Sequence, residues 1–185
     1  MTAKIGILPV GQVDAAVLVG LKEKLIQIFP DVTCTVVDAG LPLPEQAFDK
    51  RRGQYRSDVI LSKVQAFAAK RKGLRSVLGV VDVDIFVSEL NFVFGEAACP
   101  GKAALVSLWR LKPEFYGEAA DMELFEARAL KEAVHELGHT LGVKHCRRSS
   151  CVMYFSNSIF DTDGKQSLFC DDCYLQVALS INNLG

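Results

Sequence analysis

The stretch HELGHTLGVKHC, residues 135–146, contains all three histidines of the chain. His135 and His139 are four residues apart, so on a helix their side chains lie on the same face, one turn apart. Two imidazoles at this spacing can bind one zinc ion, for which Zn–N distances are ~2.0–2.1 Å. Glu136 follows the first histidine, and its carboxylate can reach a water at the metal. The segment therefore predicts a helix that carries two metal ligands and a general base.

The third histidine completes a more specific pattern. If the helix continued, His145 would point to a different face, but Gly142 can adopt positive φ and turn the chain back. Three neutral imidazoles leave the fourth zinc position open, as a catalytic site requires. The pattern HExxHxxGxxH fixes five positions and is much more specific than HExxH alone. No glutamate follows Glu136, so a third ligand from a downstream glutamate is excluded.

The rest of the chain alternates short β-rich stretches with helical patterns. Strand patterns cover residues 3–10, 32–39, 76–83, 90–97 and 102–111. Helical patterns cover residues 13–29, 58–71, 121–142 and 170–184. Asp121 stands where an N-cap is expected, just before the helix that carries the histidines. This order predicts an α/β (α+β) fold with a mixed sheet.

Composition sets the class of protein. The chain has 185 residues, of which 50% are hydrophobic and 23% are charged, as is typical of one globular domain. The net charge of −1 offers no basic surface for nucleic acid or an anionic membrane. Neither a signal-peptide pattern nor a run of ~20 apolar residues is present. We expect a full-length cytoplasmic monomer, a single domain over 1–185, without nucleic-acid or membrane partners.

Three lesser features have ordinary interpretations. The basic run Lys50–Arg52 with Arg56 is interpreted as a solvated loop. The stretch DTDG, residues 161–164, lacks most of the acidic positions of a calcium loop and is interpreted as a turn. Cys34 and Cys99 are interpreted as a packed thiol and a loop thiol.

The histidine motif is followed by CVM, residues 151–153, and CDDC, residues 170–173. Together these segments resemble the archaemetzincins, a branch of the metzincin zinc peptidases. FDKRRGQYRSD (48–58), LNFVFGEA (90–97) and RLKPEFYG (110–117) are also similar, so the resemblance covers nearly the whole chain. It implies a metzincin-like fold, in which a mixed twisted sheet packs against the active-site helix. It also implies two parts within the domain. Residues 1–142 form the sheet and helices, including the active-site helix, and residues 143–185 form a small C-terminal subdomain held together by a zinc ion.

The resemblance also implies roles for particular residues. Met153 is expected to form the Met-turn, an apolar floor beneath the histidines. Some metzincins place a metal-contacting tyrosine two residues after this methionine, but Phe155 stands there in this chain. By analogy, residues 102–111 are the candidate edge strand to which an extended peptide substrate would add, although an interior strand is the alternative.

A second metal site is expected at the clustered cysteines. Cys170 and Cys173 have the two-residue spacing of a zinc knuckle, and Cys146 and Cys151 form a looser pair. Four thiolates make a closed, structural zinc site. The alternative, a redox pair at Cys170 and Cys173, lacks a thioredoxin-like context. With the histidine site, the prediction is two zinc ions per chain.

The predicted function is a zinc metallopeptidase that acts on peptides or proteins, with Glu136 as its catalytic base. The predicted metal ligands are His135, His139, His145, Cys146, Cys151, Cys170 and Cys173. One alternative is a non-proteolytic zinc-binding regulatory protein, which would not need Glu136. Another is a three-histidine zinc endoribonuclease, a class that lacks both this glutamate and the four cysteines. Whether the peptidase trims amino termini or cuts internally is left open.

Overall fold

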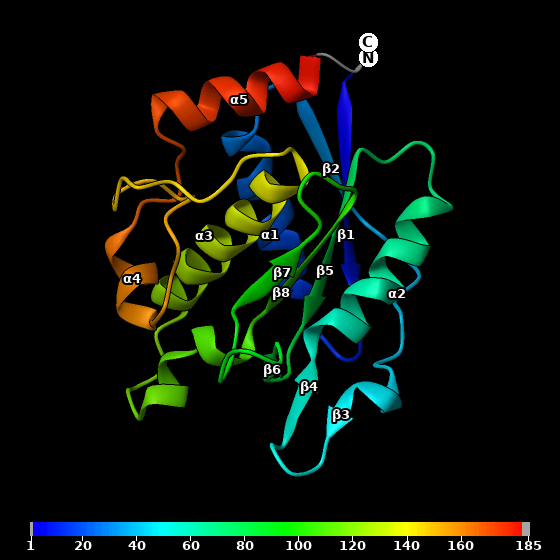
Figure 1. The fold of residues 1–185 in the computed structure, drawn as a ribbon, viewed down its shortest axis with the longest axis vertical. Coiled ribbons are helices and arrows are strands. Elements are labelled where there is room, and N and C mark those ends of the chain that lie inside the picture. Colours follow the sequence, from blue (N-terminus) through cyan, green and yellow to red (C-terminus); the bar gives the residue numbers. More distant parts are fainter. Residues whose placement is uncertain (1, 183–185) are drawn as a thin grey trace.

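A five-stranded sheet forms the centre of the computed structural model, which describes residues 2–182 (Figure 1). Its strands are β1 (Ala3–Pro9), β2 (Val32–Val36), β5 (Ser76–Val81), β7 (Gly95–Ala97) and β8 (Ala103–Ser107). Their order is β2-β1-β5-β8-β7. In this order each strand from β2 to β8 is parallel to its neighbour, and β7 runs antiparallel to β8 at one edge. The predicted mixed sheet is therefore present.

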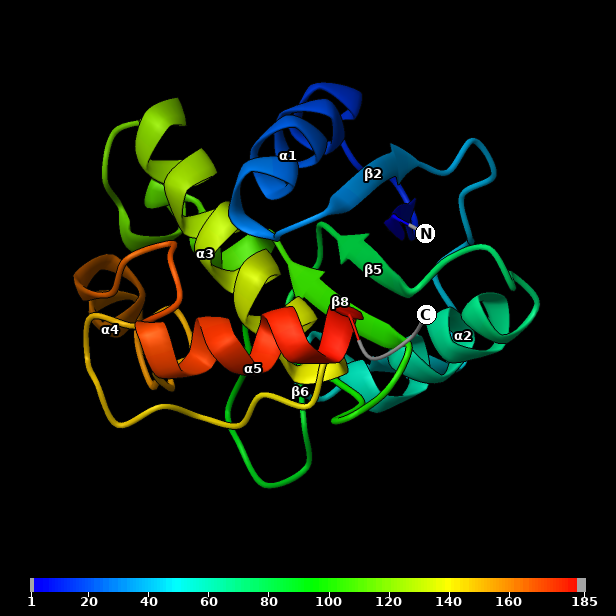
Figure 2. The same ribbon diagram turned by 90° about the horizontal axis from the view of Figure 1, so that it is seen from above.

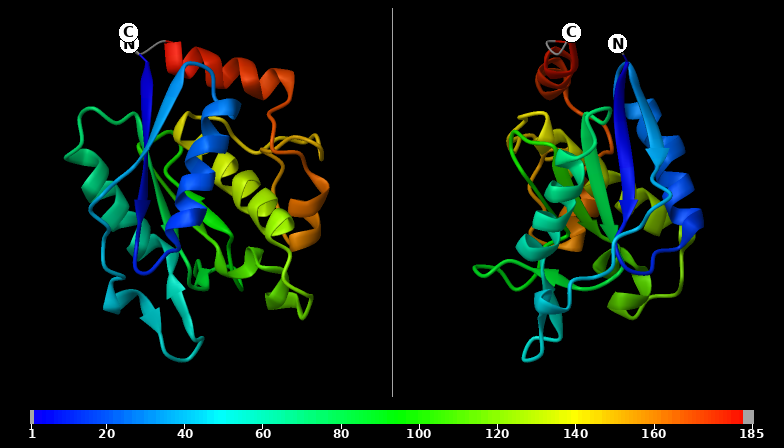
Figure 3. Two further views of the ribbon diagram at one scale, coloured as in Figure 1. Left: turned by 180° about the vertical axis from the view of Figure 1, so that it is seen from behind. Right: turned by 90° about the vertical axis from the view of Figure 1, so that its right-hand side faces the viewer.

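Three long helices cover the two faces of this sheet. The helices α1 (Ala15–Ile28) and α3 (Met122–Thr140) pack on one face, and α2 (Ser57–Ala69) packs on the other (Figures 2 and 3). Leu78 and Val80 of β5 belong to the apolar cluster under α1 and α3, whereas Val77 and Val81 belong to the cluster under α2. Burial on both faces explains why β5 and β8 are continuous apolar runs rather than alternating ones. Among residues 2–182, no helix has the length and apolarity needed to cross a membrane.

The strand predicted to be the substrate-binding edge is an interior strand, and that prediction is wrong. β8 is hydrogen-bonded to β5 on one side and to β7 on the other. The edge strand next to β8 is β7, which spans only three half-buried residues and includes Glu96. A short strand of this composition carries a weak local signal, because edge strands are often short and polar.

A small second sheet lies beside the central one. It is formed by β3 (Phe48–Asp49), β4 (Gln54–Arg56) and β6 (Ile85–Phe86), in the order β3-β4-β6. The basic run predicted to be a solvated loop lies at the turn between β3 and β4. Arg52 is held there, because its guanidinium donates to the carbonyl oxygens of Leu90 and Asn91 at 3.0 and 2.8 Å. Short 3₁₀ turns occur at Glu45–Ala47, Trp109–Leu111 and Pro113–Tyr116.

The C-terminal part adds two helices, α4 (Ile159–Gly164) and α5 (Asp171–Asn182). The prediction of a turn at DTDG is wrong, because these residues form the last four of the six residues of α4. Asp161 closes a capping box with Ser158, which stabilises the start of this helix. The buried side of α5 (Cys173, Val177, Ile181) joins the same apolar cluster as β1 and α3. The C-terminal helix thus shares the core of the main sheet, while residues 183 and 184 of the predicted last helix lie outside the described residues.

Candidate active site

The helix α3 presents the first two histidines and the glutamate. It begins at the predicted cap, where an oxygen of Asp121 accepts a hydrogen bond from the amide of Leu124 at 3.0 Å. Its last turns are buried between the sheet and the C-terminal segment. His135 and Glu136 therefore lie within the protein rather than on an exposed helix surface.

The end of α3 turns the chain as predicted. Gly142 has φ of +89°, a conformation that favours glycine because it has no Cβ. The amide of Gly142 donates to the carbonyl of His139 at 2.9 Å, and that of Val143 donates to Gly138 at 3.1 Å. This pair of bonds is the Schellman motif. It directs residues 143–146 back across the end of the helix.

The turn brings the three imidazoles together. One nitrogen of each of His135, His139 and His145 lies within 4.8 Å of those of the other two. The Nε2 atoms of His135 and His139 are 3.1 Å apart. Two nitrogens bound to one tetrahedral zinc ion at ~2.0–2.1 Å would be ~3.3 Å apart. The donor set and its spacing thus fit a zinc ion.

Backbone carbonyls orient two of the rings. The Nδ1 of His135 donates to the carbonyl oxygen of Val152 at 2.8 Å, and that of His139 donates to Val143 at 2.7 Å. Because Nδ1 carries the proton in both rings, Nε2 is left with its lone pair for a metal. Burial lowers the pKa of His135 well below its usual value, and it also lowers the pKa of His139 and His145. Burial therefore favours the neutral form, which is the form that binds metal.

Glu136 is buried beside the histidines, and a glycine makes room for it. Burial raises the pKa of its carboxyl well above the usual value, and the nearby Glu132 raises it further. Gly95 on β7 faces this side chain, and a Cβ at that position would lie 2.5 Å from Cγ of Glu136 and 2.7 Å from its Oε1. Only glycine allows β7 and the Glu136 carboxylate to approach this closely.

Met153 lies under the site with its side chain fully buried. A Cβ on Gly138 would be 2.5 Å from the Met153 sulfur. The glycine inside the motif helix thus allows close packing against this methionine, one of the uses expected of it. Phe155 contacts the site from the other side, and its ring centroid is 4.9 Å from that of His145.

The four clustered cysteines form a second group. Ligand atoms of Cys146, Cys151, Cys170 and Cys173 all lie within 4.8 Å of one another. The sulfurs of Cys146 and Cys170 are 3.8 Å apart, and two sulfurs bound to one tetrahedral zinc ion at ~2.3 Å would also be ~3.8 Å apart. Cys34 and Cys99 lie outside this group. Burial raises the pKa of Cys34 to about 11, and Cys99 is exposed.

The two groups are joined through the backbone. Cys146 follows His145 directly, and its amide donates to the carbonyl of Met153 at 2.9 Å. The amide of Cys170 donates to the sulfur of Cys151 at 3.3 Å. The cysteine group therefore connects the loop of the third histidine, the methionine turn and the start of α5.

A buried charged cluster, not expected from the sequence, links α3 to the segment around α4. The fully buried ammonium of Lys165 lies 3.0 Å from Oε1 of Glu132, and it donates to the carbonyl of Tyr154 at 3.3 Å. Arg128 forms two hydrogen bonds of 2.7 Å to Asp163. Glu132 lies three residues before His135 and four before Glu136, so helical spacing could have placed it near the site. Lys165 had no such signal.

Comparison with known proteins places this arrangement in a family. The sequence profile described as peptidase family M54 matches residues 17–178. The chain is 44% identical over 173 residues to the archaemetzincin of Methanocaldococcus jannaschii, across 94% of this chain and 92% of that protein. It is 43% identical over 176 residues to the archaemetzincin of Pyrococcus abyssi, across 94% and 93%.

Solved structures agree with this similarity. The crystal structure of archaemetzincin from Archaeoglobus fulgidus matches with a TM-score of 0.80 at 37% identity, covering 94% of this chain and 99% of that one. The crystal structure of a zinc-dependent peptidase from Methanocorpusculum labreanum matches with a TM-score of 0.84 at 28% identity, with the same coverage.

Proposed function

Because the chain belongs to peptidase family M54, the archaemetzincins, and is a zinc metallopeptidase, we propose specific roles for the residues of its site. His135, His139 and His145 hold the catalytic zinc ion, and Glu136 is the general base. The convergence of three imidazoles beside one buried carboxylate carries this proposal. A zinc ion bound there would act as a Lewis acid, which lowers the pKa of a coordinated water to ~7.

The surroundings of the histidines support hydrolysis. The three histidines and Glu136 line an open cavity of about 490 Å³, which also contacts β7. A peptide that pairs with this edge strand would pass directly over the site, as in β-augmentation. Glu136 takes a proton from the attacking water and gives it to the leaving amine. A purely zinc-binding protein would have no use for a buried base at this position.

The cysteine group has a different proposed role. Its four thiolates would fill all positions of a tetrahedral ion, which is characteristic of a structural zinc site. We therefore propose two zinc ions per chain, with only the histidine-bound ion exposed to substrate. We further propose that the chain is a monomeric single domain without a nucleic-acid partner, in line with its net charge of −1.

Metal content and peptide cleavage test the proposed function together. The purified protein is expected to contain two zinc ions by elemental analysis and to cleave members of a mixed peptide library detected by mass spectrometry. Dialysis against a chelator should abolish cleavage, and added zinc should restore it, because the open histidine site loses its ion most readily. Cleavage of RNA without cleavage of any peptide, or activity that survives complete metal removal, would contradict the proposal.

Gly95 is expected to be a positioning residue for Glu136. The Gly95→Ala substitution puts a Cβ 2.5 Å from Cγ of Glu136 and 2.5 Å from the Leu105 carbonyl oxygen, so both the carboxylate and the backbone of β7 against β8 must shift. A displacement of ~1 Å can cost ~10²-fold in rate, and we expect kcat to fall by that order.

A matched control and a rescue distinguish positioning from misfolding. Gly20→Ala adds a Cβ that meets no atom within 4 Å, and it should leave hydrolysis unchanged. In a Glu136→Asp background, where the side chain is shorter, Gly95→Ala should lower kcat by a smaller factor than it does in the wild type. If Gly95→Ala has wild-type kcat, Gly95 has no positioning role.

A further inference from the structure

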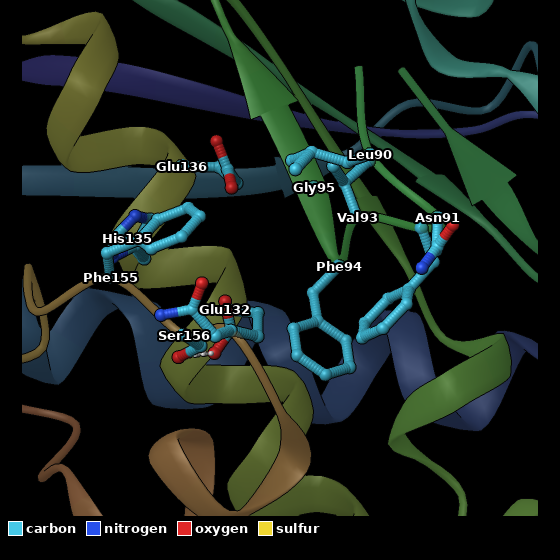
Figure 4. Close-up of a pocket in the computed structure, with 12 residues that line it drawn as sticks. Leu90, Asn91, Val93, Phe94, Gly95, Glu132, His135, Glu136, Phe155 and Ser156 are labelled. Atoms are coloured by element: carbon cyan, nitrogen blue, oxygen red, sulfur yellow. Dashed lines mark hydrogen bonds between the residues drawn. The ribbon is translucent and has the colours of Figure 1, made fainter. Parts of the chain in front are cut away.

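A cavity of about 170 Å³ opens directly beside His135 and Glu136 (Figure 4). Phe92 and Phe94, from the segment before β7, line one side, and Phe155 and Ser156 line the other. The rings of Phe92 and Phe94 meet edge to face, with centroids 5.2 Å apart. The cavity is therefore bounded by aromatic rings and lies within reach of the reacting centre.

Glu132 gives this cavity a polar wall. The residue is only 3% exposed, yet it lines the cavity. The two hydrogen bonds and the ion pair that Glu132 forms all involve one of its two carboxylate oxygens. Oε1 lies 2.9 Å from the Thr162 hydroxyl, 3.3 Å from that of Ser156, and 3.0 Å from the Lys165 ammonium. Among the described residues none donates to Oε2, so this oxygen can accept a hydrogen bond from a bound group.

Charge restricts what that group can be. The buried ammonium of Lys165 balances the Glu132 carboxylate, and the zinc ion proposed at the histidines would balance Glu136, which also lines the cavity. A cationic side chain in the cavity would add a second positive charge next to Lys165, and an acidic one would face Glu132. Bringing an unbalanced charge into such a site is costly. A neutral hydrogen-bond donor is therefore favoured.

Size and wall chemistry restrict it further. An enclosed apolar cavity of ~150 Å³ is enough to hold a benzene ring, so the observed 170 Å³ accommodates one aromatic side chain. Aromatic rings pack favourably edge to face against walls such as Phe92 and Phe94. A ring with a hydroxyl at its far end would satisfy both the aromatic walls and Oε2 of Glu132.

The direction of β7 indicates which substrate residue reaches the cavity. The cavity lies at the Gly95 end of this strand, whereas Ala97 and Cys99 lie on the other side of the histidines. Antiparallel pairing is the more common and slightly more stable way to add a strand, and a peptide added to β7 in this way would run from the Cys99 side toward the cavity. The residue that follows the cleaved bond would then point into the cavity.

We propose that this cavity is a specificity site for a tyrosine side chain at the position directly after the cleaved bond, with Glu132 accepting the hydrogen bond from its phenol. This inference rests on the proposed peptidase function. Glu132 is thus a specificity-determining residue, and the ammonium of Lys165 neutralises the charge of its carboxylate.

Peptides that differ only in Tyr or Phe at this position test the proposal. A hydrogen bond to a charged acceptor contributes about 1.5–3 kcal/mol, so the Tyr peptide should be cleaved with a kcat/KM about 10- to 100-fold higher. Lys and Glu at the same position should be poorer than Phe. Equal rates for Tyr and Phe, with robust cleavage of both, would overturn the specificity site while leaving the peptidase function intact.

A double variant assigns the preference to Glu132. Glu132→Leu with Lys165→Met removes both buried charges together, a replacement that folded proteins often tolerate. The Tyr over Phe preference should disappear or reverse. The matched control, Glu126→Leu with Lys24→Met, makes the same chemical changes at an ion pair that is about 40% exposed, and it should keep the preference.

Binding gives a readout that does not depend on turnover. In the Glu136→Ala variant, tyrosinamide should bind more tightly than phenylalaninamide by a similar factor, as measured by NMR titration. If no peptide is cleaved but this difference is present, the peptidase function fails and the site stands. If the two amides bind equally, the site fails whatever the activity.

Discussion

Replacing Glu136 with alanine is expected to lower kcat/KM for peptide hydrolysis by ~10²–10⁴-fold, the usual contribution of a general acid–base residue. The zinc content should stay at two per chain, because the three histidines and four cysteines are unchanged. The carboxylate is buried between α3 and β7, at the wall of the cavity. The neighbouring carboxylates are held by other partners, Glu132 by the Lys165 ammonium and Glu96 by the Ser57 hydroxyl, so neither is free to replace Glu136.

Matched variants make this result specific. Glu123→Ala removes an exposed carboxylate from the first turn of the same helix, about 20 Å from Glu136 at 1.5 Å per residue. It should leave kcat/KM near the wild-type value. Glu136→Gln keeps the size of the side chain but cannot accept the proton, and it should be nearly as slow as Glu136→Ala. Wild-type activity in Glu136→Gln would remove Glu136 from the role of base.

The convergence of the three histidines could be predicted from the sequence because its signals are local. A four-residue spacing fixes two side chains on one helical face, and a positive-φ turn at Gly142 is a property of glycine itself. Both are independent of the rest of the fold. Convergence of His135, His139 and His145 follows from these two local facts, and the structure brings the three rings together.

Features that depend on distant partners were missed or wrongly predicted. Lys165 pairs with Glu132 across 33 positions of the chain, and no local pattern identifies such a pair. The edge of the sheet was assigned to residues 102–111, because apolar length identifies a strand but not its neighbours. The Asp161 to Gly164 stretch has turn composition, but its aspartate caps a helix because of the preceding Ser158.

The cysteine group and the histidine group are linked through the polypeptide chain, because Cys146 directly follows His145. His145 has only Lys144 between itself and Val143, whose carbonyl orients His139, and Cys146 follows it directly. A loop held at one end by the helix and at the other by Cys146 leaves His145 little freedom. Fixing a ligand in advance strengthens metal binding, as supporting contacts around zinc sites do.

Replacing Cys173 with serine is expected to remove one zinc ion and to destabilise the whole domain. Loss of a structural metal is among the few single changes that cost ~4 kcal/mol or more. In a domain of this size that corresponds to a fall in Tm of roughly 8–16 °C. Cys173 is buried, and its helix α5 packs into the main apolar cluster, so loosening this helix affects the core. Elemental analysis and thermal unfolding measure both effects.

Cys99→Ser is the matched control, because Cys99 is an exposed thiol outside the four-cysteine group. It should keep two zinc ions and the wild-type Tm. The Cys173→Ser variant should also lose peptide hydrolysis below its own Tm, because freeing Cys146 frees His145. Glu136→Ala should show the opposite pattern, with activity lost and Tm retained. If Cys173→Ser instead keeps two zinc ions and its Tm, the cysteines hold no structural metal, and the position of His145 depends on the Gly142 turn alone.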